Sequence, residues 1–297
     1  MNRALPKFSI VMANYNNAEF LPAAIESVLG QSCVDWELLV CDDGSTDTSR
    51  QVISRYNGDP RIKYSQNETN KGLISTLNSL IPESRASYIG TLDSDDVLAS
   101  DAIEVMLRAH TENPTATLIY SQYGFFDKNM VKIREGSCRE VSPRSSILTD
   151  DCAIHFKTFK KSFALKIDCF DPAMKHAEDK DFMYKLEEQG PVIFVDQELY
   201  RYRLVEESMS HGSNLAKSRI AMALGRLEAY ERRLGTNIPN MQKHMAGSEV
   251  SYGIGASLNL MNLEKLIYFV KRCHKYKLYG SLNLDSFKTG VLGRNLW

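Results

Sequence analysis

The chain has 297 residues, a formal net charge of -1, 43% hydrophobic residues and 25% charged residues, as expected for one or two ordinary globular domains. This near-neutral charge gives no global field that would favour binding to nucleic acid. No apolar run approaches the roughly 18 residues that a membrane-spanning helix needs, and no signal-peptide pattern opens the chain. The six cysteines include no C-x-x-C pair, which indicates reduced thiols and a cytoplasmic protein.

The first hundred residues alternate between apolar runs of strand length and segments with helical periodicity. The expected strands are residues 8–13, 36–41, 61–64 and 88–92. Each is followed by an amphipathic helix, and we expect Ser45 or Thr46 to cap the second helix and Ser100 to cap the fourth. This alternating order predicts a parallel sheet with right-handed crossovers.

The pattern changes after about residue 115. Further strands are expected at 118–120, 192–195 and 199–202, and a polar loop or hairpin at 131–151. A helix should follow Glu178 and end near Gly190. From about residue 214 onward the chain has a mostly helical pattern. The predicted fold is therefore an α/β domain with a mixed, mainly parallel sheet and a helical C-terminal extension.

Two acidic clusters follow two of the expected strands. Asp42-Asp43 follows the strand at 36–41, and Asp93-Ser94-Asp95-Asp96 follows the strand at 88–92. Ligands of open α/β sheets bind at the carboxyl ends of the strands. Crowded carboxylates repel one another unless a cation lies among them, and oxygen ligands suit magnesium or manganese. The alternative is an acidic loop that only favours the start of the next helix.

Three segments, one of which contains the first acidic cluster, have both a functional and a structural interpretation. Asp42-Asp43-Gly44-Ser45 is either a turn with a helix cap or a contact for a base or a ribose. The loop at 14–17 provides an aromatic ring and amides next to it, or is simply polar. Asp179 lies at the start of a predicted helix, where it either accepts a proton from an attacking hydroxyl or stabilises the helix end.

Taken together and in order, these segments resemble the family 2 inverting glycosyltransferases over roughly residues 7–210. The matching segments are Ser9–Asn16, Ile25–Ser32, Trp36–Asp47, Asn70–Gly72, Asp93–Asp96 and Ala177–Phe182. The resemblance implies a Rossmann-like GT-A fold over residues 1–212, with a donor half at about 1–110 and an acceptor half at about 111–212. Residues 213–297 would form the helical extension.

The resemblance also implies roles for individual residues. Donor contacts are assigned to Ala13, Tyr15, Asp42, Asp43, Lys71, Asp93 and Ser94. Asp95 would be the principal ligand of Mn²⁺ or Mg²⁺, and Asp179 would be the general base. The sequence departs from many family members after Arg203, where Leu204 and Val205 stand in place of a histidine. His211 is either its replacement as a metal or phosphate contact or a surface histidine, and Lys71 is either a donor contact or an exposed lysine.

The implied activity is metal-dependent transfer of a sugar, with inversion, from a nucleotide diphosphate to a hydroxyl group. UDP is the expected nucleotide, the sugar a hexose or N-acetylhexosamine, and the acceptor a carbohydrate or lipid-linked saccharide of surface polysaccharide, O-antigen or glycolipid synthesis. The alternatives are an Asp-x-Asp phosphohydrolase or phosphotransferase and a non-catalytic nucleotide-sugar binder. No dinucleotide-binding glycine motif or P-loop is present.

The C-terminal extension has two interpretations. Between residues 263 and 279, apolar and aromatic residues alternate with lysines and arginines. Such a helix either lies on a membrane surface or packs on the catalytic domain. The expected location is therefore the cytoplasm, with or without peripheral contact at the inner face of the membrane.

Overall fold

A computed structural model describes residues 5–174, 177–204 and 215–292. Contacts between residues divide the chain into two compact units. The first unit is Met1–Val141, Asp151–Phe170 and Gln189–Val205, and the second is Ser142–Asp150, Asp171–Glu188 and Glu206–Trp297. This division differs from the predicted split at residue 212, which lies outside the described residues, and the predicted domains stay a prediction.

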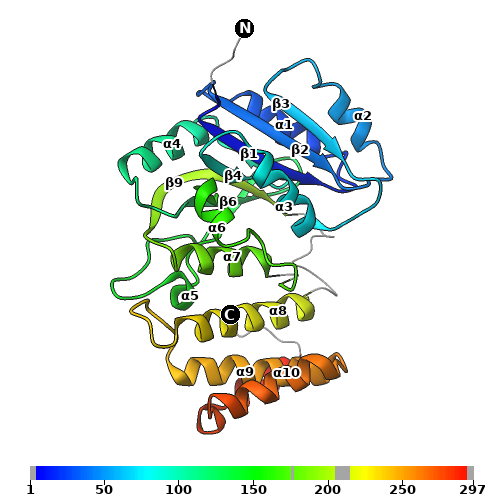
Figure 1. The fold of residues 1–297 in the computed structure, drawn as a ribbon. Coiled ribbons are helices and arrows are strands. Elements are labelled where there is room, and N and C mark those ends of the chain that lie inside the picture. Colours follow the sequence, from blue (N-terminus) through cyan, green and yellow to red (C-terminus); the bar gives the residue numbers. More distant parts are fainter. Residues whose placement is uncertain (1–4, 175–176, 205–214, 293–297) are drawn as a thin grey trace. The chain divides into compact units, whose positions relative to one another are not determined.

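One mixed sheet forms the centre of the first unit (Figure 1), with the strand order β3-β2-β1-β4-β8-β6-β9-β5 and β7 paired to β6. The strands are β1 (Phe8–Asn14), β2 (Trp36–Asp42), β3 (Ile62–Gln66), β4 (Tyr88–Thr91), β5 (Val97–Leu98), β6 (Leu118–Phe126), β7 (Lys132–Glu135), β8 (Thr158–Lys160) and β9 (Val192–Arg203). The first four strands are parallel, as predicted. Strand β8 is antiparallel to both of its neighbours, and the sequence pattern did not predict it.

The helices of the first unit connect or flank these strands. They are α1 (Leu21–Leu29), α2 (Ser49–Ser54), α3 (Leu73–Glu83), α4 (Ala102–Glu112) and α6 (Lys161–Lys166). Two predicted caps were wrong. Helix α2 begins after Thr48 and α4 begins after Asp101. The Ser45 side chain accepts hydrogen bonds from the β1–α1 loop instead, so the turn before α2 is longer than the sequence suggested.

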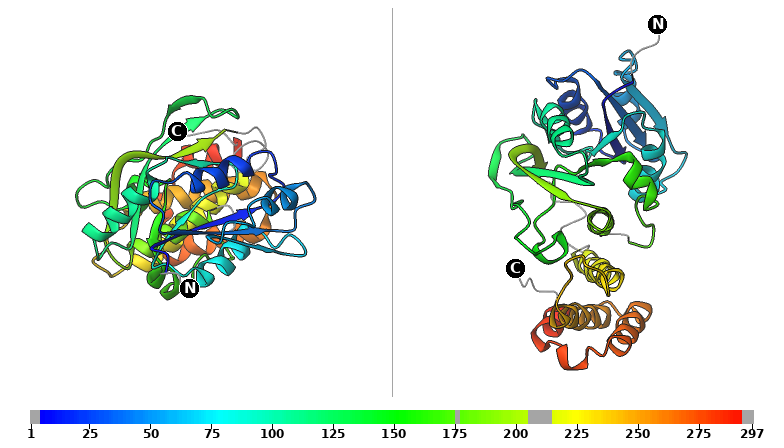
Figure 2. Two further views of the ribbon diagram at one scale, coloured as in Figure 1. Left: turned by 90° about the horizontal axis from the view of Figure 1, so that it is seen from above. Right: turned by 60° about the vertical axis from the view of Figure 1, so that its left-hand side comes forward.

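The second unit is helical. Its helices are α5 (Ile147–Asp150), α7 (Glu178–Glu187), α8 (Leu215–Arg233), α9 (Lys243–Asn259), α10 (Leu263–Lys275), a 3-10 turn (Tyr279–Ser281) and α11 (Leu284–Leu292). Helices α7, α8 and α9 lie in successive layers (Figure 2). Helix α9 packs closely on α11 through glycine, since a Cβ atom at Gly255 would collide with the carbonyl oxygen of Phe287. Within the described ranges, no helix is both long and apolar enough to cross a bilayer.

A buried glutamate ties together the strand ends opposite the acidic clusters. Glu37 of β2 is fully buried. Its carboxylate accepts hydrogen bonds from Ser9 Oγ (2.8 Å) and from the backbone and side chain of Arg85 (2.5 and 2.7 Å), and Lys63 lies 3.5 Å away. Burial alone would raise the pKa of Glu37, but the hydrogen bonds from Arg85 and Ser9 and the charge of Lys63 outweigh it and lower the pKa.

A carboxyl group whose pKa is lowered by folding makes stability depend on pH. The contribution of Glu37 is fully present above its ordinary pKa of 4.5 and is lost as the pH falls through the lowered value. We predict that Glu37→Gln lowers the free energy of unfolding by about 1–3 kcal/mol at pH 7, because Arg85 and Lys63 lose their charged partner. Urea unfolding at pH 3 to 7 measures this, and the loss should shrink at the acid end. A variant with the wild-type pH slope would contradict the assignment.

Candidate active site

Three loops meet at the carboxyl ends of neighbouring parallel strands. The first loop follows β1, the second follows β2 and the third follows β4. Asn16 Oδ1 accepts a hydrogen bond from the backbone of Thr46 (2.7 Å), and Asn17 Nδ2 donates to Ser94 Oγ (3.0 Å). The first loop is therefore hydrogen-bonded to the loops that carry both acidic clusters. The structure brings together the segments that hold six of the predicted donor contacts: Ala13, Tyr15, Asp42, Asp43, Asp93 and Ser94.

Asp42 stabilises this edge from inside the protein. Its side chain is fully buried and accepts hydrogen bonds from Asn14 Nδ2 (3.0 Å), the backbone of Ser45 (3.3 Å) and Arg50 Nε (3.2 Å). The three donors belong to the last residue of β1, to the loop after β2 and to α2. Asp42 therefore supports the shape of the site, whether or not it also contacts a ligand.

Asp43 holds the segment that carries Lys71. One oxygen accepts hydrogen bonds from Asn67 Nδ2 (2.7 Å) and the backbone of Lys71 (2.9 Å), and the other accepts from the backbone of Gly72 (2.8 Å). The loops approach closely at Gly44, where φ is +75° and a Cβ atom would lie 2.6 Å from the backbone of Thr69. The Lys71 side chain is exposed.

Two residues near the end of β1, one within the strand and one just after it, remain accessible. Ala13 is partly buried, and Tyr15 is 48% exposed. An exposed ring beside hydrogen-bonding loops can stack on a planar base. The predicted role of Tyr15 is therefore compatible with its position.

The second acidic cluster, Asp93–Asp96, is named here the acidic loop. It joins β4 to β5, which pairs with β9. Within it, Asp96 is buried and accepts hydrogen bonds from Tyr200 Oη (2.6 Å) and the backbone of Arg203 (2.7 Å). Arg203 Nε also donates to the carbonyl oxygen of Asp95 (2.6 Å). Tyr200 and Arg203 thus fix the acidic loop from strand β9.

The sequence pattern did not reveal this role of Tyr200 and Arg203. Alternation along a strand places residues an odd number apart on opposite faces, yet both residues bond to Asp96. They do so because Arg203 ends β9 and uses its backbone amide. Arg203 is only 3% exposed, and its guanidinium lies over the ring of Phe20.

Crowding of carboxyl groups dominates the electrostatics of the acidic loop. Burial and the charge of Asp93 raise the pKa of Asp95 to about 6, although Arg203 acts in the opposite direction. Burial and the charges of Asp95 and Asp93 raise the pKa of Asp96 well above its ordinary value. A cation at this loop would relieve the repulsion.

The residues present fit a magnesium or manganese ion whose coordination shell is completed by the substrate. These ions commonly bind through one or two carboxylates together with phosphate oxygens and water. The acidic loop supplies two carboxylates, Asp93 and Asp95, on either side of Ser94. The described part of the chain contains no cluster of three or more His, Cys, Asp or Glu residues placed to hold a metal. The predicted ligand His211 lies outside the described residues.

Asp179 lies in the second unit, in the first turn of α7. The turn is acidic, with Glu178, Asp179 and Asp181, and the N-cap residue is Ala177, whose side chain makes no cap. Asp179 is partly buried, and its Oδ1 accepts a hydrogen bond from the backbone of Lys180 (2.8 Å). The role of Asp179 as a base stays a prediction.

The comparisons with known proteins agree with this geometry. Residues 9–165, more than half of the chain, match the model of glycosyl transferase family 2. The chondroitin synthase of Pasteurella multocida is 30% identical over 211 residues, which are 71% of this chain. The chain spans only about a fifth to a third of the chondroitin and hyaluronan synthases that it matches.

Two solved structures share the fold. TarS 1–349 of S. aureus, in complex with UDP-GlcNAc, has a TM-score of 0.64 and 16% identity over 98% of this chain and 93% of that one. The mannosyltransferase PcManGT of Pyrobaculum calidifontis, in complex with GDP-Man and Mn²⁺, has a TM-score of 0.59 and 12% identity over 99% and 88%. The predicted GT-A fold is thereby confirmed, and the match to the family model shows that this chain belongs to glycosyl transferase family 2.

Proposed function

We propose that this protein is a metal-dependent, inverting glycosyltransferase that uses a UDP-sugar. The observation that carries the proposal is the acidic loop, whose crowded carboxyl groups lie at the ligand-binding edge of the sheet and are fixed by Tyr200 and Arg203. A divalent ion bound there would neutralise charge on the departing diphosphate. The solved structure with UDP-GlcNAc supports a UDP-sugar donor, and the one with GDP-Man and Mn²⁺ supports the use of a divalent ion.

The proposed donor contacts follow from the three loops. Tyr15 would stack on the base, and Lys71, whose backbone is held by Asp43, would reach the base or the phosphates. Asp93 would lie near the ribose and Asp95 would hold the ion. These side chains come from fixed loops, so the donor would meet a preorganised edge.

In the proposed reaction, Asp179 accepts the proton of the acceptor hydroxyl. The hydroxyl oxygen attacks the anomeric carbon while the bond to the diphosphate breaks, so one displacement inverts the configuration. A hexose or N-acetylhexosamine and a carbohydrate or lipid-linked saccharide acceptor are proposed, in agreement with the polysaccharide synthases among the relatives. Synthesis of a surface polysaccharide, an O-antigen or a glycolipid is the proposed setting.

Substitutions should separate donor binding from chemistry. With Mn²⁺, one nucleotide sugar out of UDP-, GDP- and dTDP-sugars should raise the melting temperature by about 2–5 °C through binding linkage.

Asp95→Ala should lose the metal-dependent part of this shift and nearly all transfer. Asp179→Asn should keep the shift but lower transfer by about 100-fold or more, because the carboxylate assigned to accept the proton is lost.

Thermal melts and release of the nucleoside diphosphate measure these effects. Asp285→Asn, an exposed change in α11, serves as the control for Asp179→Asn. Wild-type transfer by Asp95→Ala would remove its role as metal ligand, and wild-type transfer by Asp179→Asn would remove its role as base. Absence of any donor-dependent shift or transfer in the wild type would overturn the proposed function.

Tyr200→Phe tests the support of the acidic loop. The change removes the hydrogen bonds of the hydroxyl with Asp96 (2.6 Å) and with the backbone and side chain of Asp93 (3.3 and 3.4 Å), and it leaves the aromatic ring. If the ion binds Asp95, the Mn²⁺ concentration for half-maximal transfer should rise by about tenfold, as for other groups that orient metal ligands. Tyr120→Phe is the matched control. Tyr120 lies on β6, and its buried hydroxyl donates to the carbonyl oxygen of Arg139. Equal metal requirements in both variants would contradict the prediction.

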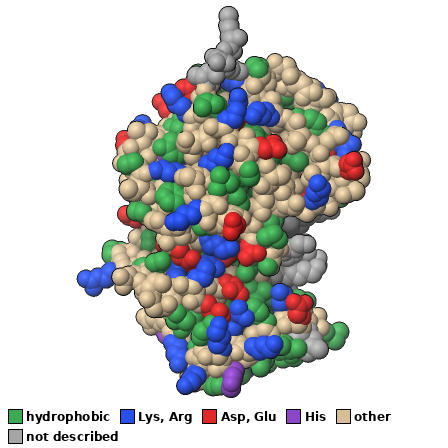
Figure 3. Space-filling view, in the orientation of Figure 1, with side chains coloured by type: hydrophobic (Ala, Val, Ile, Leu, Met, Phe, Trp, Pro, Cys, Tyr) green, Lys and Arg blue, Asp and Glu red, His purple; other side chains and the backbone are tan. Residues whose placement is uncertain are grey.

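We also propose that the protein is cytoplasmic and contacts a membrane through α10. Phe269 and Cys273 of this helix are buried, whereas Ile267 and Val270 are 45% and 50% exposed. Lys271 is exposed on the same helix. Figure 3 shows basic and apolar side chains, together with some acidic ones, on the visible face of the C-terminal helices. Such a surface suits anionic lipids.

Vesicle flotation tests the membrane contact. The full chain should float with vesicles that contain anionic phosphatidylglycerol and much less with neutral ones. Replacing both Ile267 and Val270 by Asp should abolish flotation, because it removes apolar contact and adds negative charge. Ile133→Asp is the matched control, since Ile133 is 53% exposed on β7 of the first unit. A wild-type chain that fails to float would refute the contact.

A further inference from the structure

Helix α7, which carries Asp179, is bonded to α8 near its beginning. Asp181, two residues after Asp179, is fully buried. Its carboxylate lies 3.1 Å from Arg232 Nη1 of α8 and 2.8 Å from Lys185 Nζ of α7. The first turn of α7 is therefore connected by an ion pair to the last turn of α8.

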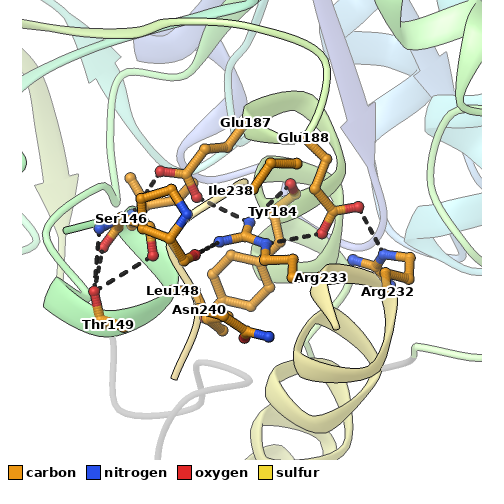
Figure 4. A network of polar contacts seen from close by, with 12 residues as sticks. Ser146, Leu148, Thr149, Tyr184, Glu187, Glu188, Arg232, Arg233, Ile238 and Asn240 are labelled. Atoms are coloured by element: carbon orange, nitrogen blue, oxygen red, sulfur yellow. Dashed lines mark hydrogen bonds and ion pairs between the residues drawn. The ribbon is translucent and has the colours of Figure 1, made fainter. Parts of the chain in front are cut away.

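The other end of α7 is bonded to Arg232 and also to the next residue of α8, Arg233 (Figure 4). Arg232 Nε lies 2.8 Å from Glu188 Oε2, and Arg233 lies 3.1 Å from Glu188 Oε1 and 2.9 Å from Glu187 Oε2. Arg232 alone thus joins Asp181 to Glu188, which are seven residues or about 10 Å apart along the helix. One side chain restrains both the tilt and the rotation of α7.

The Arg233 side chain is fully buried in this network. Its guanidinium also donates to the carbonyl oxygens of Tyr184 and Pro239, both at 3.1 Å. Glu187 in turn accepts a hydrogen bond from the backbone of Ile147 (2.8 Å). Buried ion pairs add little stability compared with apolar packing. Their directional bonds do, however, limit the positions that a helix can take.

We infer that Arg232 and Arg233 are positioning residues that hold Asp179 in the orientation needed to accept the acceptor proton. The inference rests on the proposed function, because it concerns the base assigned there. Asp179 and Asp181 share the first turn of one short helix, so a restraint on Asp181 also restrains Asp179. Helix α8 lies beyond the matched family segment at residues 9–165. The C-terminal helices would then belong to the catalytic apparatus.

The test compares Arg232→Ala with Arg272→Ala in the full-length protein. Arg272 forms a similar two-partner ion pair, with Glu228 and Glu231, that joins α10 to α8 and does not include α7. Arg232→Ala should lower kcat by about 10- to 100-fold, because small displacements of a catalytic group are costly. The donor KM should stay within about twofold of wild type. Arg272→Ala should change neither constant.

Arg232→Lys is the second variant and covers the case in which Arg232→Ala does not fold. Lysine keeps the charge but cannot bond in a fork to both carboxylates. We expect a kcat between those of the wild type and Arg232→Ala. A folded Arg232→Ala or Arg232→Lys with wild-type kcat would overturn the inference, as would a rise in donor KM that matches the fall in kcat.

Two further measurements separate this inference from the proposed function. Hydrogen exchange of the amides of residues 178–187 should be about tenfold faster in Arg232→Ala and unchanged in Arg272→Ala. In the double variant with Asp179→Asn, the Arg232 substitution should cause little additional loss of kcat. Unchanged exchange or fully additive losses would refute positioning even if transfer is confirmed. If the proposed function is wrong, the wild-type protein will show no transfer. Hydrogen exchange would still decide whether Arg232 restrains α7.

Discussion

The crowding of three carboxyl groups after β4 is the constraint on which the rest of the first unit depends. Asp96 is held by a phenol and a backbone amide, which are neutral donors, so its hydrogen bonds position it without cancelling charge. Arg203 is close, but it does not offset burial and the charge of Asp93, and the pKa of Asp95 remains raised. The pairing of β5 with β9 brings Tyr200 and Arg203 to the loop. A loop whose carboxylate repulsion is only partly relieved by Arg203 is suited to receive a cation.

The second unit handles buried carboxylates in a different way. Asp181 is paired with Lys185 and Arg232, Glu187 with Arg233, and Glu188 with both arginines. Here each acid has a basic partner within the protein, so the cluster has no comparable need for an added ion. The contrast separates an acidic cluster that fits a ligand from one that supports a helix. Residue type and position in the sequence would not distinguish the two acidic clusters, since both lie near the start or end of a helix or strand.

The sequence predicted the parts of the fold that depend on neighbouring residues. The four parallel strands and the acidic clusters at their ends follow from local apolar runs, and the structure confirms them. The start of α2 was missed because Ser45 bonds to Asn14 and to the backbone of Asn16, about 30 residues earlier. The support of Asp96 by Arg203 spans 107 residues, and that of Asp181 by Arg232 spans 51. Such partners arise from topology, and no local periodicity encodes them.

The hydrogen bonds of Asp43 bear on how a donor would be recognised. Both of its oxygens already accept bonds from residues 67–72, so any bond to a base would add to a set that the protein itself has nearly completed. Loss of the carboxylate would release the segment that carries Lys71 as well as remove a ligand contact. The same reasoning applies to Asp42, whose three donors belong to the protein. These two acids therefore shape the edge that carries Tyr15 and Lys71. In the proposed donor complex, these exposed residues would have the greater freedom to select the nucleotide.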